Sequence, residues 1–251
     1  MQVGTSMFSN VKDHLLAKIA DAPITADPFP HVVIEQVFTP EFYRAIQDNL
    51  LPDEAYTPLV ETGRVTSNYP RTRLCFMGGE DDMLSAEAGA GFWRELFGVF
   101  KDPALMGASL RRFEPVIRQR LATDLTDMRS DKLLLHPEVF LMRDKNSFLL
   151  KPHMDSRKKA VTALFYLPGT DDRASLGTSF YRLRSGIAAP EMGTQYARED
   201  FELLKTIPYL PNTMLAFANM AGAYHGLEPV AGAAGGRDVL IYDVKFAEVG
   251  A

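Results

Sequence analysis

The sequence predicts an α+β protein whose helices precede an all-β region. Apolar residues recur at helical spacing in the first half of the chain. From about residue 133 onward the pattern changes to short runs rich in β-branched and aromatic residues, separated by Gly, Pro, Asn and Asp. Helices followed by strands indicate segregated α and β parts. Seven or eight strands in the second half match a jelly roll, which is two antiparallel sheets packed face to face.

Length and composition limit the class of protein. A chain of 251 residues, 46% hydrophobic and 24% charged, suits one domain, with 1–130 mainly helical and 131–251 forming the jelly roll. The net charge of −5 predicts no broad nucleic-acid-binding surface. Cys75 is the only cysteine, so an intrachain disulfide and a thiolate zinc site are both excluded. The N-terminus lacks the pattern of a signal peptide, and no apolar run approaches the ~20 residues of a membrane span. We therefore expect a cytoplasmic protein with no membrane partner. The oligomeric state is left open.

The first 130 residues contain the predicted helices. Residues 8–20 form an amphipathic pattern, and 31–38 is a β-branched run that predicts a strand. Thr39-Pro40-Glu41 then gives an N-cap, a proline in the first turn and an acidic residue, which together predict the start of a helix. Further helices are expected at 84–100 and 103–123, the second kinked or divided at Pro115.

Residues 51–82 show little periodicity, and we interpret them as a long loop with one short strand around 73–77. A loop of this length is either functional or an irregular excursion. The strands of the second half are expected at 133–142, 148–155, 160–167, 177–183, 213–218, 224–230 and 237–246, with a loop around 186–193 and a flexible connection at 232–236. The run 160–167 is almost entirely apolar, which is typical of a buried central strand.

A metal site is predicted by three residues. If the segment around His153 is a strand, then His153 and Asp155 lie on the same face. His225, in Tyr224-His225-Gly226, is the best candidate for a third ligand. Two histidines and one carboxylate on one side of a metal form the facial triad of non-haem Fe(II) oxygenases, which leaves positions open for substrate and O₂. Alternatively, each of these residues is an ordinary surface or buried polar group.

The order His-x-Asp, a long gap, a second His and then Arg237 opening a strand resembles the Fe(II)/2-oxoglutarate-dependent oxygenase superfamily, in particular its prolyl-hydroxylase-like branch. The resemblance covers about residues 28–247, with the specific motifs in 140–246. It implies a double-stranded β-helix with the N-terminal helices packed on one sheet. It also implies Fe(II), 2-oxoglutarate and O₂ as cofactor and cosubstrates, with ascorbate useful in vitro, and segments such as 51–82 covering the mouth of the active site.

The resemblance further implies a pocket for the cosubstrate. Arg237 is the candidate for binding the far carboxylate of 2-oxoglutarate, because a guanidinium group matches a carboxylate in a bidentate manner. Tyr166 matches a tyrosine that helps to hold that carboxylate, or it is a core aromatic residue. Thr162, on the same strand face, is a weaker candidate. Family members often carry Ser or Thr two residues after the arginine, whereas this chain has Val239.

The implied activity is hydroxylation of a small molecule or a protein side chain, with release of succinate and CO₂. Because Asp155 is present, hydroxylation is favoured over the halogenation performed by relatives that lack this carboxylate. Basic residues near the motif suit an anionic substrate or are solvated charges: Arg143, Lys145, Arg157, Lys158, Lys159, Arg182 and Arg184. The alternatives are a cupin-like metal enzyme that does not use 2-oxoglutarate, and a non-catalytic jelly-roll binding protein.

Overall fold

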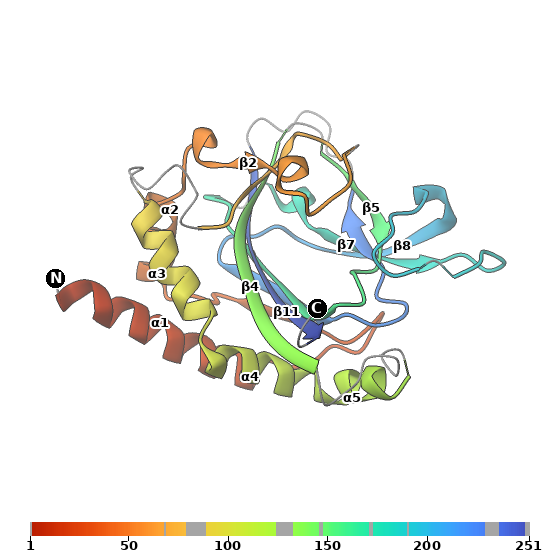
Figure 1. The fold of residues 1–251 in the computed structure, drawn as a ribbon, viewed down its shortest axis with the longest axis horizontal. Coiled ribbons are helices and arrows are strands. Elements are labelled where there is room, and N and C mark those ends of the chain that lie inside the picture. The colour runs from red at the N-terminus through yellow and green to blue at the C-terminus, as the bar shows by residue number, and fades with distance from the viewer. Residues whose placement is uncertain are drawn as a thin grey trace.

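A computed structural model describes residues 2–67, 69–78, 89–123, 133–145, 148–170, 173–189, 191–228 and 236–248. Two antiparallel sheets face one another, and helices cover the outer side of the larger one (Figure 1). The larger sheet has the strand order β1-β9-β6-β11-β4-β3-β2, and the smaller one the order β5-β10-β7-β8. The prediction of an α+β fold with a jelly-roll core is confirmed. No helix in the described parts of the chain is both long and apolar enough to cross a bilayer.

The helices are α1 (Gln2–Asp21), α2 (Pro40–Asp48), α3 (Ala90–Phe100), α4 (Pro103–Arg112) and α5 (Glu114–Thr123). Thr39 caps α2 as expected, since its side chain accepts a hydrogen bond from the backbone N–H of Phe42. The run 103–123 is divided, as predicted, and the break falls at Phe113, just before Pro115. The part of the predicted helix at 84–88 lies outside the described residues.

The strands are β1 (His31–Glu35), β2 (Thr57–Pro58), β3 (Arg73–Phe76), β4 (Leu133–Asp144), β5 (Leu150–His153), β6 (Lys159–Tyr166), β7 (Thr178–Leu183), β8 (Phe201–Ile207), β9 (Thr213–Ala218), β10 (His225–Leu227) and β11 (Arg237–Glu248). β6 is buried between β9 and β11, as its apolar sequence predicts. The flexible connection expected at 232–236 lies outside the described residues, except for Gly236.

Two strands were not predicted. β8 is an edge strand that is buried only at its two ends, so its sequence has no clear alternation of apolar and polar residues. β2 has only two residues and pairs with β3 at the edge of the large sheet that lies opposite β1. The segment 51–77 therefore has more regular structure than the long loop that was expected.

The alternation of side chains along the strands separates two cores. On β11, Leu240 and Tyr242 point outward to the helices, where Phe100 packs on Tyr242 with ring centroids 5.4 Å apart. Val239 and Ile241 point inward to the space between the sheets and pack with residues of both. The inner core thus lies between the sheets, and polar groups gather around it.

The segment 51–77 covers one side of this inner core. Leu59 is buried within it, and Val65, Tyr69 and Met77 pack against it. The guanidinium group of Arg64 lies 5.0 Å from the ring centroid of Phe140, a residue of the inner core. This covering segment therefore packs against the inner core, and its place over the mouth of an active site stays a prediction.

Candidate functional site

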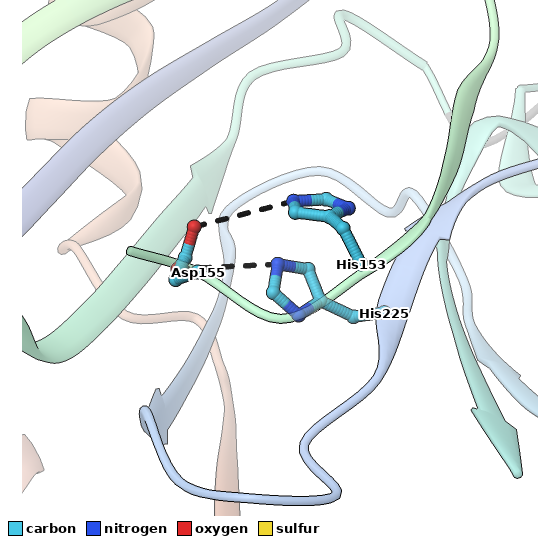
Figure 2. Close-up of side chains that lie close together, drawn as sticks. All are labelled: His153, Asp155 and His225. Atoms are coloured by element: carbon cyan, nitrogen blue, oxygen red, sulfur yellow. Dashed lines mark ion pairs between the residues drawn. The ribbon is translucent and has the colours of Figure 1, made fainter. Parts of the chain in front are cut away.

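Two histidines lie side by side on neighbouring strands of the small sheet. His153 ends β5 and His225 begins β10, and the two residues are direct partners in the antiparallel register. Residues opposite each other in such a pair point to the same face. Their rings accordingly lie side by side, with centroids 4.4 Å apart (Figure 2).

Asp155 completes the cluster from the turn after β5. Its Oδ1 lies 4.0 Å from Nε2 of His153 and its Oδ2 lies 3.9 Å from Nε2 of His225 (Figure 2). One donor atom from each residue lies within 4.8 Å of the others, and Asp155 and His225 are buried. A six-coordinate divalent ion with bonds of ~2.1 Å places neighbouring donors about 3 Å apart. The cluster therefore needs to contract by about 1–2 Å to hold such an ion.

Backbone carbonyl groups fix the orientation of both imidazoles. Nδ1 of His153 lies 2.9 Å from the carbonyl oxygen of Lys151, and Nδ1 of His225 lies 3.0 Å from that of Ala223. A carbonyl oxygen only accepts, so each Nδ1 carries the proton and donates it. Each Nε2 is then left with a lone pair that points at the cluster, which is the arrangement that metal-binding histidines require.

Gly226 allows the two histidine strands to approach each other. A Cβ atom built at Gly226 would lie 2.4 Å from the carbonyl oxygen of Leu150, which is closer than any side chain permits. The glycine after His225 is therefore required by the contact between β10 and β5.

A closed ring of polar contacts holds the carboxylate of Asp155. Nζ of Lys159 lies 3.2 Å from Oδ1 of Asp155 and 3.0 Å from Oδ2 of Asp243. The hydroxyl group of Thr162 lies 2.7 Å from Oδ2 of Asp155 and 3.0 Å from Oδ1 of Asp243. Lys159 and Thr162 therefore each bridge the same two carboxylates. Lys159, which was grouped with possible solvated charges, forms buried ion pairs instead.

The electrostatics of the cluster favour the protonation states that bind metal. Burial and the neighbouring His225 lower the pKa of His153 to about 3, and burial also lowers the pKa of His225. Both rings are thus neutral near pH 7. Burial alone would raise the pKa of Asp155, but Lys159 and the two histidines hold it well below its usual range. The site therefore offers two neutral imidazoles and one ionised carboxylate.

Arg237 lies at the opposite end of the inner face of β11 from Asp243. Its Nη1 is 3.1 Å from Oδ2 of Asp144, and its Nε donates to the carbonyl oxygen of Leu176 over 2.7 Å. Its Nη2 lies 3.5 Å from the hydroxyl oxygen of Thr178. The guanidinium carbon is 5.6 Å from the ring centroid of Tyr166, so these two predicted residues are neighbours.

The structure separates the other two residues that were considered for this pocket. The hydroxyl group of Tyr166 donates to Thr178 over 2.7 Å, beside Arg237. Thr162 instead contacts Asp155 and lies beside the cluster of His153, Asp155 and His225. Val239 is fully buried in the inner core and offers no hydroxyl group, and Thr178 of β7 supplies one next to Arg237.

Three polar residues around Arg237 were not identified from the sequence: Thr178, Asp144 and Arg73. Thr178 opens a strand after Gly177, which is a weak signal. Asp144 fell between the strands expected at 133–142 and 148–155, and Arg73 was the start of a short strand in a loop. Only the pairing of β3, β4 and β11 brings Arg73 and Asp144 to Arg237.

Comparisons with known proteins give structural likenesses only. No family model and no curated protein matches the sequence. A prolyl-4-hydroxylase from Pseudomonas putida is similar over 92% of this chain and 98% of its own, with 12% identity and a TM-score of 0.44. The non-haem α-ketoglutarate-dependent epimerase SnoN of nogalamycin biosynthesis covers 96% and 86%, with 13% identity and a TM-score of 0.49. HygX from Streptomyces hygroscopicus, with nickel and 2-oxoglutarate bound, covers 86% and 82%, with 14% identity and a TM-score of 0.42.

The sheet topology and the cluster of His153, Asp155 and His225 are observed without reference to these similar structures. Two antiparallel sheets enclose the inner core, and the small sheet brings the histidines of the predicted motif into direct register. The chain therefore has a two-sheet jelly-roll fold and a complete His-x-Asp…His set of residues that could hold a metal ion.

Proposed function

We propose that this protein is a non-haem Fe(II)/2-oxoglutarate-dependent dioxygenase that hydroxylates a small molecule or a protein side chain and releases succinate and CO₂. The observation that carries the proposal is the cluster of His153, Asp155 and His225, with both Nε2 atoms and the carboxylate directed at one another. Mixed imidazole and carboxylate donors on one side suit Fe(II).

His153, Asp155 and His225 would hold the iron, which supplies the activation of O₂ when it is bound. The protein's part is to orient the ligands and to limit water. Backbone carbonyl groups fix the two imidazoles, and the ring through Thr162 fixes the carboxylate. The proposal therefore requires no rearrangement of tautomers or of charge when the metal binds.

The distance to Arg237 suits a short dicarboxylate. Nη2 of Arg237 lies beside Thr178, and Thr178 is two residues from Phe180, which pairs with His225. A step of two residues along a strand is about 7 Å. A five-carbon dicarboxylate that chelates the metal at its keto-acid end spans a gap of this order. Arg237, with Tyr166 beside it, would then bind the far carboxylate.

The first test is the turnover of 2-oxoglutarate in the presence of Fe(II) and ascorbate, measured as succinate. The proposal predicts slow succinate formation without a substrate, and its loss in Asp155→Ala. Binding of metal without any binding of 2-oxoglutarate would favour the cupin-like alternative. Failure to bind divalent metal would favour a non-catalytic binding protein.

The second test asks whether Arg237 contributes to the binding of 2-oxoglutarate. Removing one side of a buried charged hydrogen bond costs about 2–5 kcal/mol, so Arg237→Ala should weaken 2-oxoglutarate binding by roughly 30-fold or more. Binding of the metal should be nearly unchanged. Arg237→Lys should recover only part of the affinity, because an ammonium group lacks the planar fork. Arg182, which is exposed and lies 3.7 Å from Glu202, gives the control variant Arg182→Ala. An unchanged titration for Arg237→Ala would exclude Arg237 from the site.

A further inference from the structure

Three charged residues form a row across the inner face of the large sheet. Arg73 of β3 lies directly opposite Asp144 of β4, and Asp144 lies directly opposite Arg237 of β11. Directly opposed residues of antiparallel strands share a face, so all three side chains lie on the same side. Each of the three is more than 90% buried.

The central carboxylate is shared between the two arginines. Oδ1 of Asp144 lies 3.3 Å from Nε of Arg73, and Oδ2 lies 3.1 Å from Nη1 of Arg237. Arg73 also donates from Nη1 to the hydroxyl oxygen of Tyr69 over 3.2 Å, and its guanidinium carbon lies 4.8 Å from the ring centroid of Phe148. Its Nε makes no hydrogen bond within the described residues. The guanidinium group of Arg73 is thus buried but incompletely paired.

The row carries more positive than negative charge. Two guanidinium groups share one carboxylate, which leaves one positive charge in excess among the described residues. The outer face of the same strands does not offset it, because Arg143 and Lys145 there are balanced by Asp238 and Asp53. Burial disfavours the charge on Arg73, but Asp144 and, at longer range, Asp155 keep its pKa raised. A buried, uncompensated charge is costly, so the row is suited to one additional anion.

We propose that Arg73 is a second binding residue for the far carboxylate of the cosubstrate, so that Arg73 and Arg237 hold this carboxylate together while Asp144 positions both. This inference rests on the proposed function, and it adds a residue from the N-terminal half of the chain. The carboxylate supplies the one negative charge that the row lacks, and Nε of Arg73, which lies 3.3 Å from Oδ1 of Asp144 without a hydrogen bond to the described residues, is the donor that remains for it.

Binding of the cosubstrate would then join two parts of the chain. Arg73 lies in the covering segment 51–77, whose Leu59 and Tyr69 pack on the inner core, whereas Arg237 begins the last strand of the barrel. A carboxylate between the two arginines is in contact with both parts. The covering segment is therefore expected to gain protection from hydrogen exchange when 2-oxoglutarate binds.

The test compares two ligands that differ only at the far end. 2-Oxoglutarate and 2-oxopentanoate share the keto-acid end, but only the former has a second carboxylate. Their affinities for the Ni(II)-loaded protein, measured by calorimetry, give a preference that reports on the far carboxylate alone. Arg73→Met should reduce this preference by about tenfold or more and leave the affinity for 2-oxopentanoate unchanged. Arg143→Met, which removes a guanidinium group from the outer face of β4, is the matched control and should leave the preference unchanged.

The outcomes separate this inference from the proposed function. A preference that is lost in Arg237→Met but kept in Arg73→Met would overturn the role of Arg73 and leave the proposed function standing. A wild-type protein with no preference would contradict the proposed function itself. If Arg73→Met does not fold, Arg73→Lys keeps the charge and should still reduce the preference several-fold, because it loses the planar fork. An unchanged preference in Arg73→Lys would then overturn the inference.

Discussion

The hydroxyl group of Thr162 lies 2.7 Å from Oδ2 of Asp155, and this contact comes from β6, which carries neither histidine of the cluster. A carboxylate that binds a metal is usually oriented by such outer partners, and their loss typically costs 10–100-fold in metal affinity. The relationship makes Thr162 a positioning residue for Asp155.

Replacing Thr162 should therefore weaken metal binding without unfolding the protein. Thr162→Val keeps the shape and removes the hydroxyl group, and we expect the affinity for Ni(II) or Co(II) to fall by about 10–100-fold. Thr162→Ser should restore most of it. Thr213→Val is the control, because Thr213 is equally buried but its hydroxyl group faces the carbonyl oxygen of Pro211. Equal metal affinities in Thr162→Val and the wild type would show that the contact does not orient Asp155.

Gly226→Ala should disrupt the metal site through the backbone. The new methyl group would collide with the carbonyl oxygen of Leu150, so β10 must move away from β5 and carry His225 with it. We expect the metal affinity to fall by at least about tenfold, together with a loss of stability of about 1–3 kcal/mol. Gly91→Ala on α3, where a Cβ meets nothing within 4 Å, should be neutral or slightly stabilising. Metal titration and urea unfolding of both variants measure the contrast, and wild-type metal affinity in Gly226→Ala would contradict the prediction.

Asn219 should link the stability of a turn to metal binding. Its Nδ2 lies 2.8 Å from the carbonyl oxygen of Ser156 and 3.2 Å from that of Asp155, in the turn that carries the carboxylate of Asp155. Asn219→Ala leaves these acceptors without their donor and should cost about 1–3 kcal/mol of stability. The metal affinity should fall as well.

Asn212→Ala is the control for this prediction. Asn212 is also buried, and its side chain exchanges two hydrogen bonds with the backbone of Phe38 instead of the turn that carries Asp155. Its replacement should reduce stability by a similar amount and leave metal affinity unchanged. Equal losses of metal affinity in the two variants would mean that Asn219 acts only through global stability.

Glu138 should make stability depend on acid pH. Burial would raise its pKa, but Arg64 and Lys245 lower it to about 2. A carboxylate whose pKa is lowered in the folded state stabilises the protein fully at pH values above its pKa in the unfolded state, about 4.5. This contribution is lost as the pH falls toward about 2, the pKa in the folded state. Glu138→Gln should thus be less stable than the wild type by about 1 kcal/mol at pH 7, with the difference shrinking toward pH 2. Glu202→Gln, at an exposed pair, should show almost no effect at either pH. Urea unfolding as a function of pH measures this, and a difference for Glu138→Gln that stays constant with pH would contradict it.

The parts of the site that the sequence predicts are those that follow from local periodicity. His153 and Asp155 share a face because strands alternate, and His225 was the candidate for the third ligand through the order His-x-Asp, a long gap and a second His. The ring around Asp155 was not predicted, because it joins Lys159 and Thr162 to Asp243, more than 80 residues away. Lys159 in particular follows two other basic residues, and nothing in that run distinguishes a buried lysine from solvated ones.

The fold, too, could be predicted from the sequence only where local periodicity or capping determines an element. The apolar run of β6 and the capped start of α2 predict their structures without tertiary information. β8 was missed because an edge strand with both faces largely exposed has little apolar alternation to detect. The row of Arg73, Asp144 and Arg237 depends on the register of three strands, and register is set by the pairing of segments that are distant in sequence.

The strand β11 sets the spacing between the two ends of the site. Arg237 and Asp243 lie on its inner face six residues apart, Arg237 beside Asp144 and Asp243 beside Lys159, which also contacts Asp155. An interval of six residues corresponds to about 20 Å along the strand. Inserting or deleting one residue within this interval would turn one of the two side chains to the helices, and a change of two would keep both inward but shift their separation by about 7 Å. The number of residues between Arg237 and Asp243 therefore fixes how far Arg237 lies from the carboxylate that shares Lys159 and Thr162 with Asp155, and a change in this number would move the two ends of the proposed site relative to each other.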